Sequence, residues 1–224
     1  MTSSALPYSR TIPSSLIRRV GQCVVGLIIA GTGVALIVDA DIGLAPWDVL
    51  HKGISRHTGI GVGTVIIIVG FALLALWIPL RVRPGLGTIL NAGLIGGTVN
   101  VVLPHLPEPD NFALQLVEMA AGVVAFGIGT ALYIGAGLGP GPRDGLMTGL
   151  AARGMSLRAV RTGIELTVLA AGIALGGTFG VGTLLYALAI GPLAHVFVPA
   201  LTIAPAPVEA SAPRVPACAP APSR

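Results

Sequence analysis

Six stretches of mostly apolar residues, each about twenty residues long, constrain this chain more than any other feature. A helix of about 18 to 20 apolar residues is long enough to cross the hydrocarbon core of a bilayer, which is about 30 Å thick. The stretches are continuously apolar and rich in Gly, Ala and Leu, whereas the strands of a membrane barrel alternate polar and apolar residues. The sequence therefore predicts an all-α, polytopic membrane helix bundle. We expect about six transmembrane helices, at roughly 20–38, 61–80, 85–103, 112–134, 157–176 and 181–200.

The distribution of basic residues predicts the orientation of these helices. Only 10% of the residues are charged, and eleven of the thirteen basic ones fall on one side of the predicted membrane. An excess of Lys and Arg marks cytoplasmic segments, so we expect both termini in the cytoplasm. The net charge of +4 is not gathered on one segment, so nucleic acid is not an expected partner. The eleven residues are Arg10, Arg18, Arg19, Arg81, Arg83, Arg143, Arg153, Arg158, Arg161, Arg214 and Arg224.

The chain matches itself, which predicts two related halves. With a shift of 96, residues 26–53 and 122–149 are identical at 11 of 28 positions, and with a shift of 95, residues 85–96 and 180–191 are identical at 7 of 12. The first apolar stretch has a counterpart in the fourth, so it belongs to the fold and is not a removable signal. The predicted organisation is a cytoplasmic segment, a first membrane repeat, an extracytoplasmic loop, a second membrane repeat and a disordered Pro/Ala-rich cytoplasmic tail, at 1–19, 20–103, 104–111, 112–204 and 205–224.

Each half contains three predicted crossings, and an odd number makes the second half enter the membrane from the opposite side. The sequence therefore predicts a 3+3 inverted repeat. Inverted repeats with interrupted helices recur in secondary transporters, whose binding sites lie between the two halves.

Two related helix-breaking motifs follow the first crossing of each half. The stretch GLAPWDVL begins at Gly43 and has its counterpart in GLGPGPRDGLM, which begins at Gly137. A proline fits the first turn of a helix and a carboxylate is favourable near its N-terminus, so each motif predicts a short helix, over 46–55 and 142–152. The predicted helix-break residues are Gly43, Pro46, Gly139, Pro140, Gly141 and Pro142.

Two arrangements of the short helices are open at this point. The segment before each helix is long enough to reach toward the middle of the membrane, which allows the pair to form re-entrant hairpins. Alternatively, both helices lie flat on the two membrane surfaces and Asp48 and Asp144 are only helix-start charges. We expect the two aspartates to differ in function, with the stronger loss on mutation of Asp144, because Arg143 stands beside it.

Other polar residues in the apolar stretches complete the candidate site. Arg161 and Glu165 are one helical turn apart and can form an ion pair, which serves either as a structural pair near the membrane surface or as a contact for substrate or proton. Their counterparts in the first half are Ile66 and Gly70, so we expect any chemistry to be asymmetric. The candidate substrate or proton site comprises Asp48, Asp144, Arg143, Arg161 and Glu165.

Several residues receive simpler interpretations. Trp47 and Trp77 are expected at the membrane interfaces, His51 is expected to be a surface histidine, and the other histidines, His57, His105 and His195, are scattered along the chain. No Ser/His/Asp or Cys/His arrangement and no HExxH or CxxC motif occurs, so the sequence predicts no enzymatic activity, no cofactor and no metal site.

Four strings resemble the YczE-like family of bacterial integral membrane proteins, which is related to the wider YitT-type group: GLAPWDVLHKGIS at 43–55, RPGLGT at 83–88, GLGPGPRDGLM at 137–147 and VGTLLYALAIGP at 181–192. The resemblance extends over roughly residues 20–200. It implies a small bacterial inner-membrane protein of about five or six helices and supplies no substrate. Ala45 stands where such proteins are expected to have glycine.

Two classes of function remain open from the sequence. Inverted repeats with paired helix breaks favour a secondary transporter of a small, unidentified solute. The alternative is a membrane accessory protein that assembles, anchors or regulates a partner without transporting anything. The lipid bilayer is an expected partner. A small solute, a second copy of the chain and another membrane protein are the further partners that these two classes allow.

Overall fold

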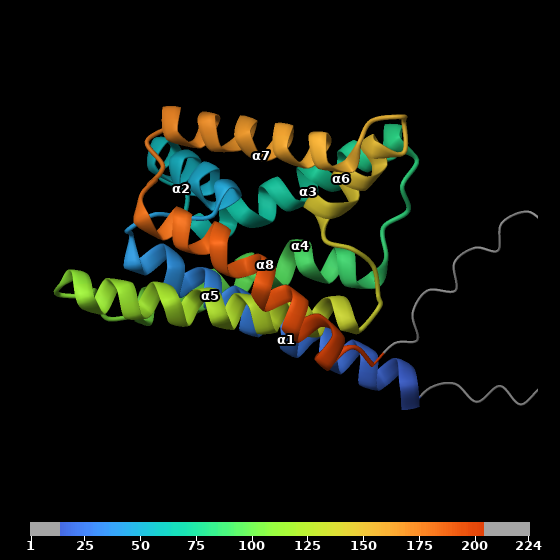
Figure 1. Cartoon of the computed structure of the whole chain (residues 1–224), viewed down its shortest axis with the longest axis horizontal. Coiled ribbons are helices and arrows are strands. Elements are labelled where there is room, and N and C mark those ends of the chain that lie inside the picture. The colour runs from blue at the N-terminus through green and yellow to red at the C-terminus, as the bar shows by residue number, and fades with distance from the viewer. Residues whose placement is uncertain (1–13, 204–224) are drawn as a thin grey trace, which may run out of the picture.

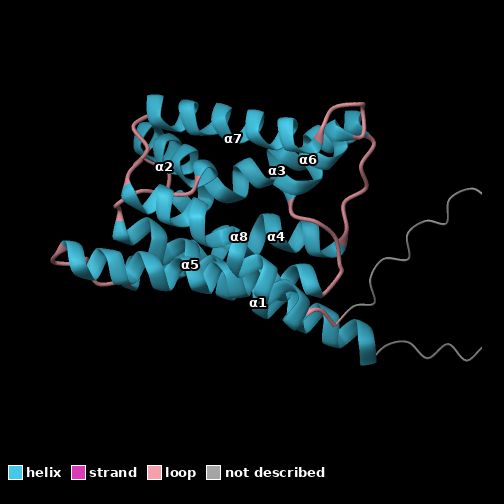
Figure 2. Cartoon of the chain, viewed as in Figure 1, coloured by secondary structure: helices cyan, strands magenta, loops and turns pink. Residues whose placement is uncertain are grey.

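The computed structural model describes residues 14–203, and the regular structure in this part of the chain is entirely helical (Figure 2). The all-α prediction is confirmed, and six long helices coincide with the six predicted apolar stretches. The predicted tail at 205–224 and most of the predicted N-terminal segment lie outside the described residues. The elements are α1 (Ser14–Ala40), α2 (Pro46–Thr58), α3 (Val62–Leu80), α4 (Leu86–Val102), the short 3-10 helix η1 (Leu103–His105), α5 (Phe112–Gly135), α6 (Pro142–Ala151), α7 (Leu157–Ala174) and α8 (Val181–Leu201).

Helices α1 and α5, the first helix of each half, pack against each other in opposite directions. The guanidinium of Arg19, near the start of α1, donates hydrogen bonds of 2.7 and 2.6 Å to the carbonyls of Ala136 and Gly137, just after the end of α5. Glycines bring the two backbones close together, since a Cβ built on Gly26 would lie 2.7 Å from the carbonyl oxygen of Gly129. Small residues at such positions are typical of membrane helix pairs.

Five helices are long and apolar enough to cross a membrane: α1, α3, α4 with η1, α5 and α8. Helix α7 has 18 residues but carries Arg158, Arg161 and Glu165, which lower its apolar character. It nevertheless runs between the two ends of the bundle (Figure 1). A helix of this length spans about 27 Å. The sixth crossing therefore stays a prediction that the course of α7 supports.

Both ends of the described chain lie at the same end of the bundle (Figure 1). The amide of Ile203 donates to the carbonyl of Gly135 at 3.2 Å, and the side chain of Gln22, near the start of α1, donates to the carbonyl of Leu201 at 2.7 Å. Chain ends on one side agree with an even number of crossings. Which side of the membrane they face stays a prediction.

The two halves differ in how their last two long helices pack. Helices α3 and α4 touch through Gly63 and Gly96, where a Cβ on either glycine would collide with the backbone carbonyl of the other. The counterparts in the second half are Arg158 and Gly191, and a Cβ on Gly191 would meet no atom within 4 Å. Among the described residues, α7 and α8 lack the extended packing that joins α3 to α4. The bundle is thus closed on one side and open between α7 and α8.

Candidate functional site

The two short helices begin at the prolines that the sequence indicated. Helix α2 starts at Pro46 and α6 at Pro142, and the residue before each proline is extended. Asp48 and Asp144 lie in the first turns, as predicted. The predicted ends were close, since α6 stops one residue early and α2 continues three residues further, to Thr58.

The N-termini of α2 and α6 meet inside the bundle. A guanidinium nitrogen of Arg143 lies 3.6 Å from a carboxylate oxygen of Asp48, and the guanidinium lies 5.4 Å from the centre of the Trp47 ring. Two helices lying flat on opposite membrane surfaces would be separated by the hydrocarbon core of about 30 Å. The contact therefore fits the re-entrant arrangement and not the flat one.

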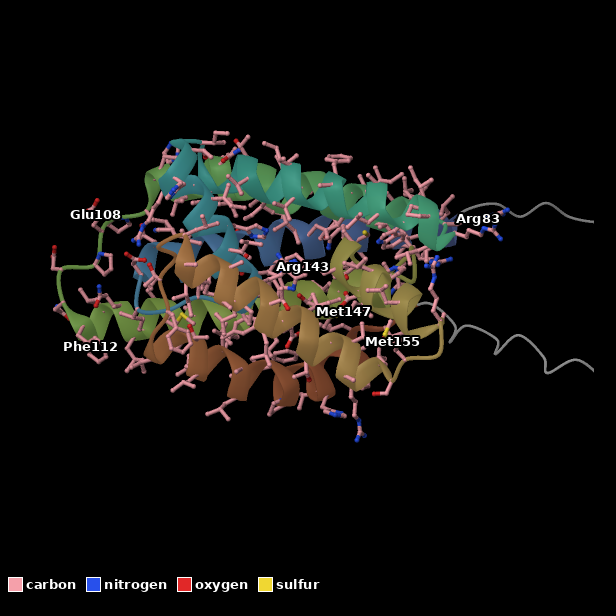
Figure 3. The ribbon with its side chains drawn as sticks, turned by 90° about the horizontal axis from the view of Figure 1, so that it is seen from above. Arg83, Glu108, Phe112, Arg143, Met147 and Met155 are labelled. Atoms are coloured by element: carbon pink, nitrogen blue, oxygen red, sulfur yellow. The ribbon has the colours of Figure 1, made fainter. Side chains whose placement is uncertain are left out.

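Figure 3 places Arg143 near the middle of the molecule's length, with Glu108 and Phe112 at one end and Arg83 at the other. Arg143 was counted among the basic residues of the cytoplasmic side, and this assignment was wrong. The guanidinium lies deep in the bundle because α6 turns back from there toward the end that carries Arg83. The other basic residues carry the orientation argument without it.

The extended segments before α2 and α6 hydrogen-bond to helix starts of the other half. The amide of Gly182 in α8 donates to the carbonyl of Ile42 at 3.0 Å, and the amide of Gly87 in α4 donates to the carbonyl of Leu138 at 2.9 Å. These two bonds occupy corresponding positions of the sequence repeat. Non-helical backbone is tolerated at membrane depth where protein satisfies its polar groups, so the bonds support the re-entrant arrangement.

The backbone conformation at Gly43 and Gly139 explains why each motif contains a glycine at this position. Their φ angles are +130° and +123°, a backbone region that side chains disfavour. A Cβ on Gly43 would also lie 2.8 Å from the amide nitrogen of Gly180, and one on Gly139 would lie 2.7 Å from the hydroxyl of Thr88. Each glycine thus permits both the turn into the bundle and the close approach of a neighbouring helix.

Asp48 is a buried carboxylate with two charged or polar partners. Only 2% of the residue is exposed, and its Oδ1 lies 3.1 Å from Nδ1 of His51, which is itself 1% exposed. The charge of Arg143 balances that of the carboxylate, and burial away from water disfavours a second positive charge on the imidazole. The neutral form of His51 therefore fits this site, and it donates its Nδ1 proton to the carboxylate.

Asp144 is exposed and has no ion pair within the described part of the chain. Its one side-chain hydrogen bond is long, from the hydroxyl of Tyr133 at 3.5 Å. The two aspartates therefore occupy different environments, although they correspond in the repeat. This difference was expected from the neighbouring residues, whereas its functional consequence stays a prediction.

A cavity of about 660 Å³ lies between the halves and is lined by residues from α2 to α8. Arg143, Asp144, Arg161 and Glu165 line it, and Asp48 lies just behind its wall, bonded to the lining residue His51. Arg161 and Glu165 form the expected ion pair at 3.0 Å. The structure thus brings all five candidate site residues to one cavity, which their spacing in the sequence did not require.

Three simpler interpretations were wrong. His51 is not a surface residue but the buried partner of Asp48. Trp77 is 1% exposed, and its indole N–H donates to the carbonyl of Pro142 at 3.1 Å, so it supports the start of α6 and does not mark an interface. Trp47 is also buried and lines the cavity. The positions of the two tryptophans near the ends of apolar stretches suggested membrane interfaces. Sequence position does not reveal the short helices that cover these rings.

Sequence reasoning missed several lining residues. Tyr133, Tyr186 and His195 all face the cavity. The tyrosines carried a usable signal, since a hydroxyl within an apolar membrane stretch requires a polar neighbour. His195 carried none, because its position in the repeat points to no partner. Within residues 14–203, no group of three or more His, Cys, Asp or Glu side chains is arranged to hold a metal ion.

The amino-acid sequence of this chain is similar to that of several uncharacterized proteins. The model of a family of unknown function, DUF6198, matches residues 17–199. An uncharacterized protein of Haemophilus influenzae is 38% identical over 172 residues, covering 76% of this chain and 79% of the relative. The uncharacterized membrane protein YczE of Bacillus subtilis is 37% identical over 178 residues, covering 78% and 82%. The uncharacterized protein YyaS of the same organism is 29% identical over 182 residues, covering 78% and 90%. No solved structure matches the chain.

Proposed function

The chain belongs to the family of unknown function DUF6198 and is a YczE-like membrane protein, and we propose that it is a secondary transporter of a small solute in the bacterial inner membrane. The proposal includes a 3+3 inverted repeat, cytoplasmic termini and no enzymatic activity. Its site is the cavity between the halves.

The meeting of two half-helix N-termini at this cavity carries the proposal. Transporters built from inverted repeats bind substrate near the middle of the membrane, where interrupted helices expose polar groups to the site. Here Pro46 and Pro142 begin their helices at the cavity wall, and the aspartates of both first turns are at or beside it. Charged residues are costly inside a membrane and are typical of functional sites.

The difference between the two halves is a second support. Alternating access requires a scaffold with two arrangements, each exposing the same site to a different side. The halves share their sequence pattern, yet α3 and α4 are closed through Gly63 and Gly96 while α7 and α8 are apart. A transporter in one of its two states would have one half closed and the other open in this way.

Solute movement in proteoliposomes tests the proposal. Purified protein is reconstituted, incubated with a mixture of small solutes, and the vesicle contents are identified by mass spectrometry. We expect at least one solute to enter with the wild-type protein and not with Gly191→Phe, because Gly191 lines the cavity and a Cβ there meets no atom within 4 Å, so a large side chain has room to fill the space. Failure of every solute to enter, together with stable copurification of a membrane partner, would favour the accessory role.

A further inference from the structure

The charged groups around the cavity do not balance. Arg143 is paired with Asp48 and Arg161 with Glu165. With the histidines His51 and His195 left out of the count, these two cations and three carboxylates leave one excess negative charge, and Asp144 is the carboxylate without an ion pair among the described residues. A carboxylate that lacks an ion pair is stabilised by a nearby cation.

Aromatic rings line the same cavity as this carboxylate. Tyr133 touches Asp144 through its hydroxyl, and Phe126 and Tyr186 form a tilted pair with ring centres 5.8 Å apart. Aromatic faces attract cations, and quaternary ammonium ions in particular are bound by such groups. The Trp47 ring is already occupied by Arg143, so Tyr133, Phe126 and Tyr186 are the rings available to a ligand.

The remaining walls and the route of entry favour a cation with an apolar part. Most lining residues besides these are aliphatic, among them Ile66, Leu73 and Ile190. The cavity reaches the gap between α7 and α8, where the side chain of Arg161 is 62% exposed. This opening between two helices gives an amphiphilic ligand a path to the cavity.

We propose that the cavity binds an organic ammonium ion, which enters between α7 and α8 and places its cationic nitrogen against Asp144 and the neighbouring ring of Tyr133, with its apolar part toward the other rings of the cavity. This substrate class rests on the proposed transport function, although binding itself does not require it. The cavity volume of about 660 Å³ accommodates a small aromatic ammonium ion, since pockets for such ligands commonly have about 300 to 1,000 Å³.

The protein carries its own reporter for this binding. Its two tryptophans are Trp47, which lines the cavity, and Trp77, which is bonded to the first residue of α6. Tryptophan fluorescence of the purified full chain in nonionic detergent is therefore titrated with benzyltrimethylammonium. Phenylacetate and benzyl alcohol serve as the anionic and neutral controls of similar size.

We expect a saturable fluorescence change with benzyltrimethylammonium and none with the two controls. Asp144→Asn should weaken binding at least tenfold, Asp144→Glu should retain part of it, and Asp110→Asn, which removes an exposed carboxylate from the loop before α5, should leave it unchanged. Equal binding of phenylacetate, no saturable signal with the cation, or wild-type affinity in folded Asp144→Asn would overturn the inference. Binding without transport would refute the proposed function alone, whereas transport of another solute without cation binding would refute this inference alone.

Discussion

Replacing Asp48 by asparagine should destabilise the protein far more than the same change at Asp144. The amide oxygen introduced by Asp48→Asn would still accept the hydrogen bond from His51, so the main loss is the negative charge opposite Arg143. Removing one partner of a buried ion pair commonly costs about 3 to 5 kcal/mol, because the other charge is left without compensation. The side chain of Arg143 is 27% exposed and reaches the cavity, which lowers the expected cost to about 2 to 4 kcal/mol.

A double-mutant cycle measures this interaction directly. Arg143→Gln should also be destabilising, because it leaves the buried Asp48 carboxylate without its cation, and the double variant should lose less than the sum of the two. We expect a coupling of about 1 to 3 kcal/mol. The free energy of unfolding is measured by denaturant titration in mixed micelles, with tryptophan fluorescence as the signal. Asp144→Asn is the matched control and should cost only about 0.3 to 1 kcal/mol, the value of a helix-start charge.

Additive losses in this cycle would refute the reasoning. If the double variant loses the full sum of the single losses, Asp48 and Arg143 do not stabilise each other, and the two short helices do not meet as described. Equal losses for Asp48→Asn and Asp144→Asn would contradict the different environments of the two carboxylates.

Three further predictions use matched positions of the repeat and the chain ends. Gly96→Ala should cost about 1 to 3 kcal/mol in unfolding experiments, because the methyl group would collide with α3, whereas Gly191→Ala should change stability by less than about 0.5 kcal/mol. Trp77→Phe should cost about 1 to 2 kcal/mol in the same assay, because the carbonyl of Pro142 loses its donor. Single cysteines are introduced into a cysteine-free background at Thr2, Asp110 and Ser223. An impermeant thiol reagent applied to intact cells should label only the cysteine at position 110. Labelling at position 2 or 223 would contradict cytoplasmic termini.

Apolar length and turn chemistry made the helices predictable. A long apolar stretch has no other way to satisfy its backbone in lipid, and each short helix was marked by a proline followed by an aspartate. Helix starts were accurate at Pro46 and Pro142 because the missing amide of proline fixes that boundary. The end of α2 was less certain, since Gly59, which caps it, lies in a segment without apolar periodicity.

Contacts between distant segments were not predictable in the same way. The spacing of Asp48 and Arg143 in the sequence does not reveal that α2 and α6 point toward each other, and the burial of His51 depends on that meeting. The repeat indicated which residues correspond but not where they differ in packing. The open side between α7 and α8 follows from how whole helices are placed, a property that one-dimensional patterns do not record.

Access to the cavity from both sides of the membrane is the most direct test of the transport account. A single cysteine at Ala194, a cavity-lining residue of α8, is exposed to an impermeant methanethiosulfonate reagent in right-side-out and in inverted vesicles. Alternating access predicts that the cysteine reacts in both preparations, because the cavity opens in turn to each side. Reaction in one preparation only, with a folded protein in both, would contradict the claim that this cavity is a transport site.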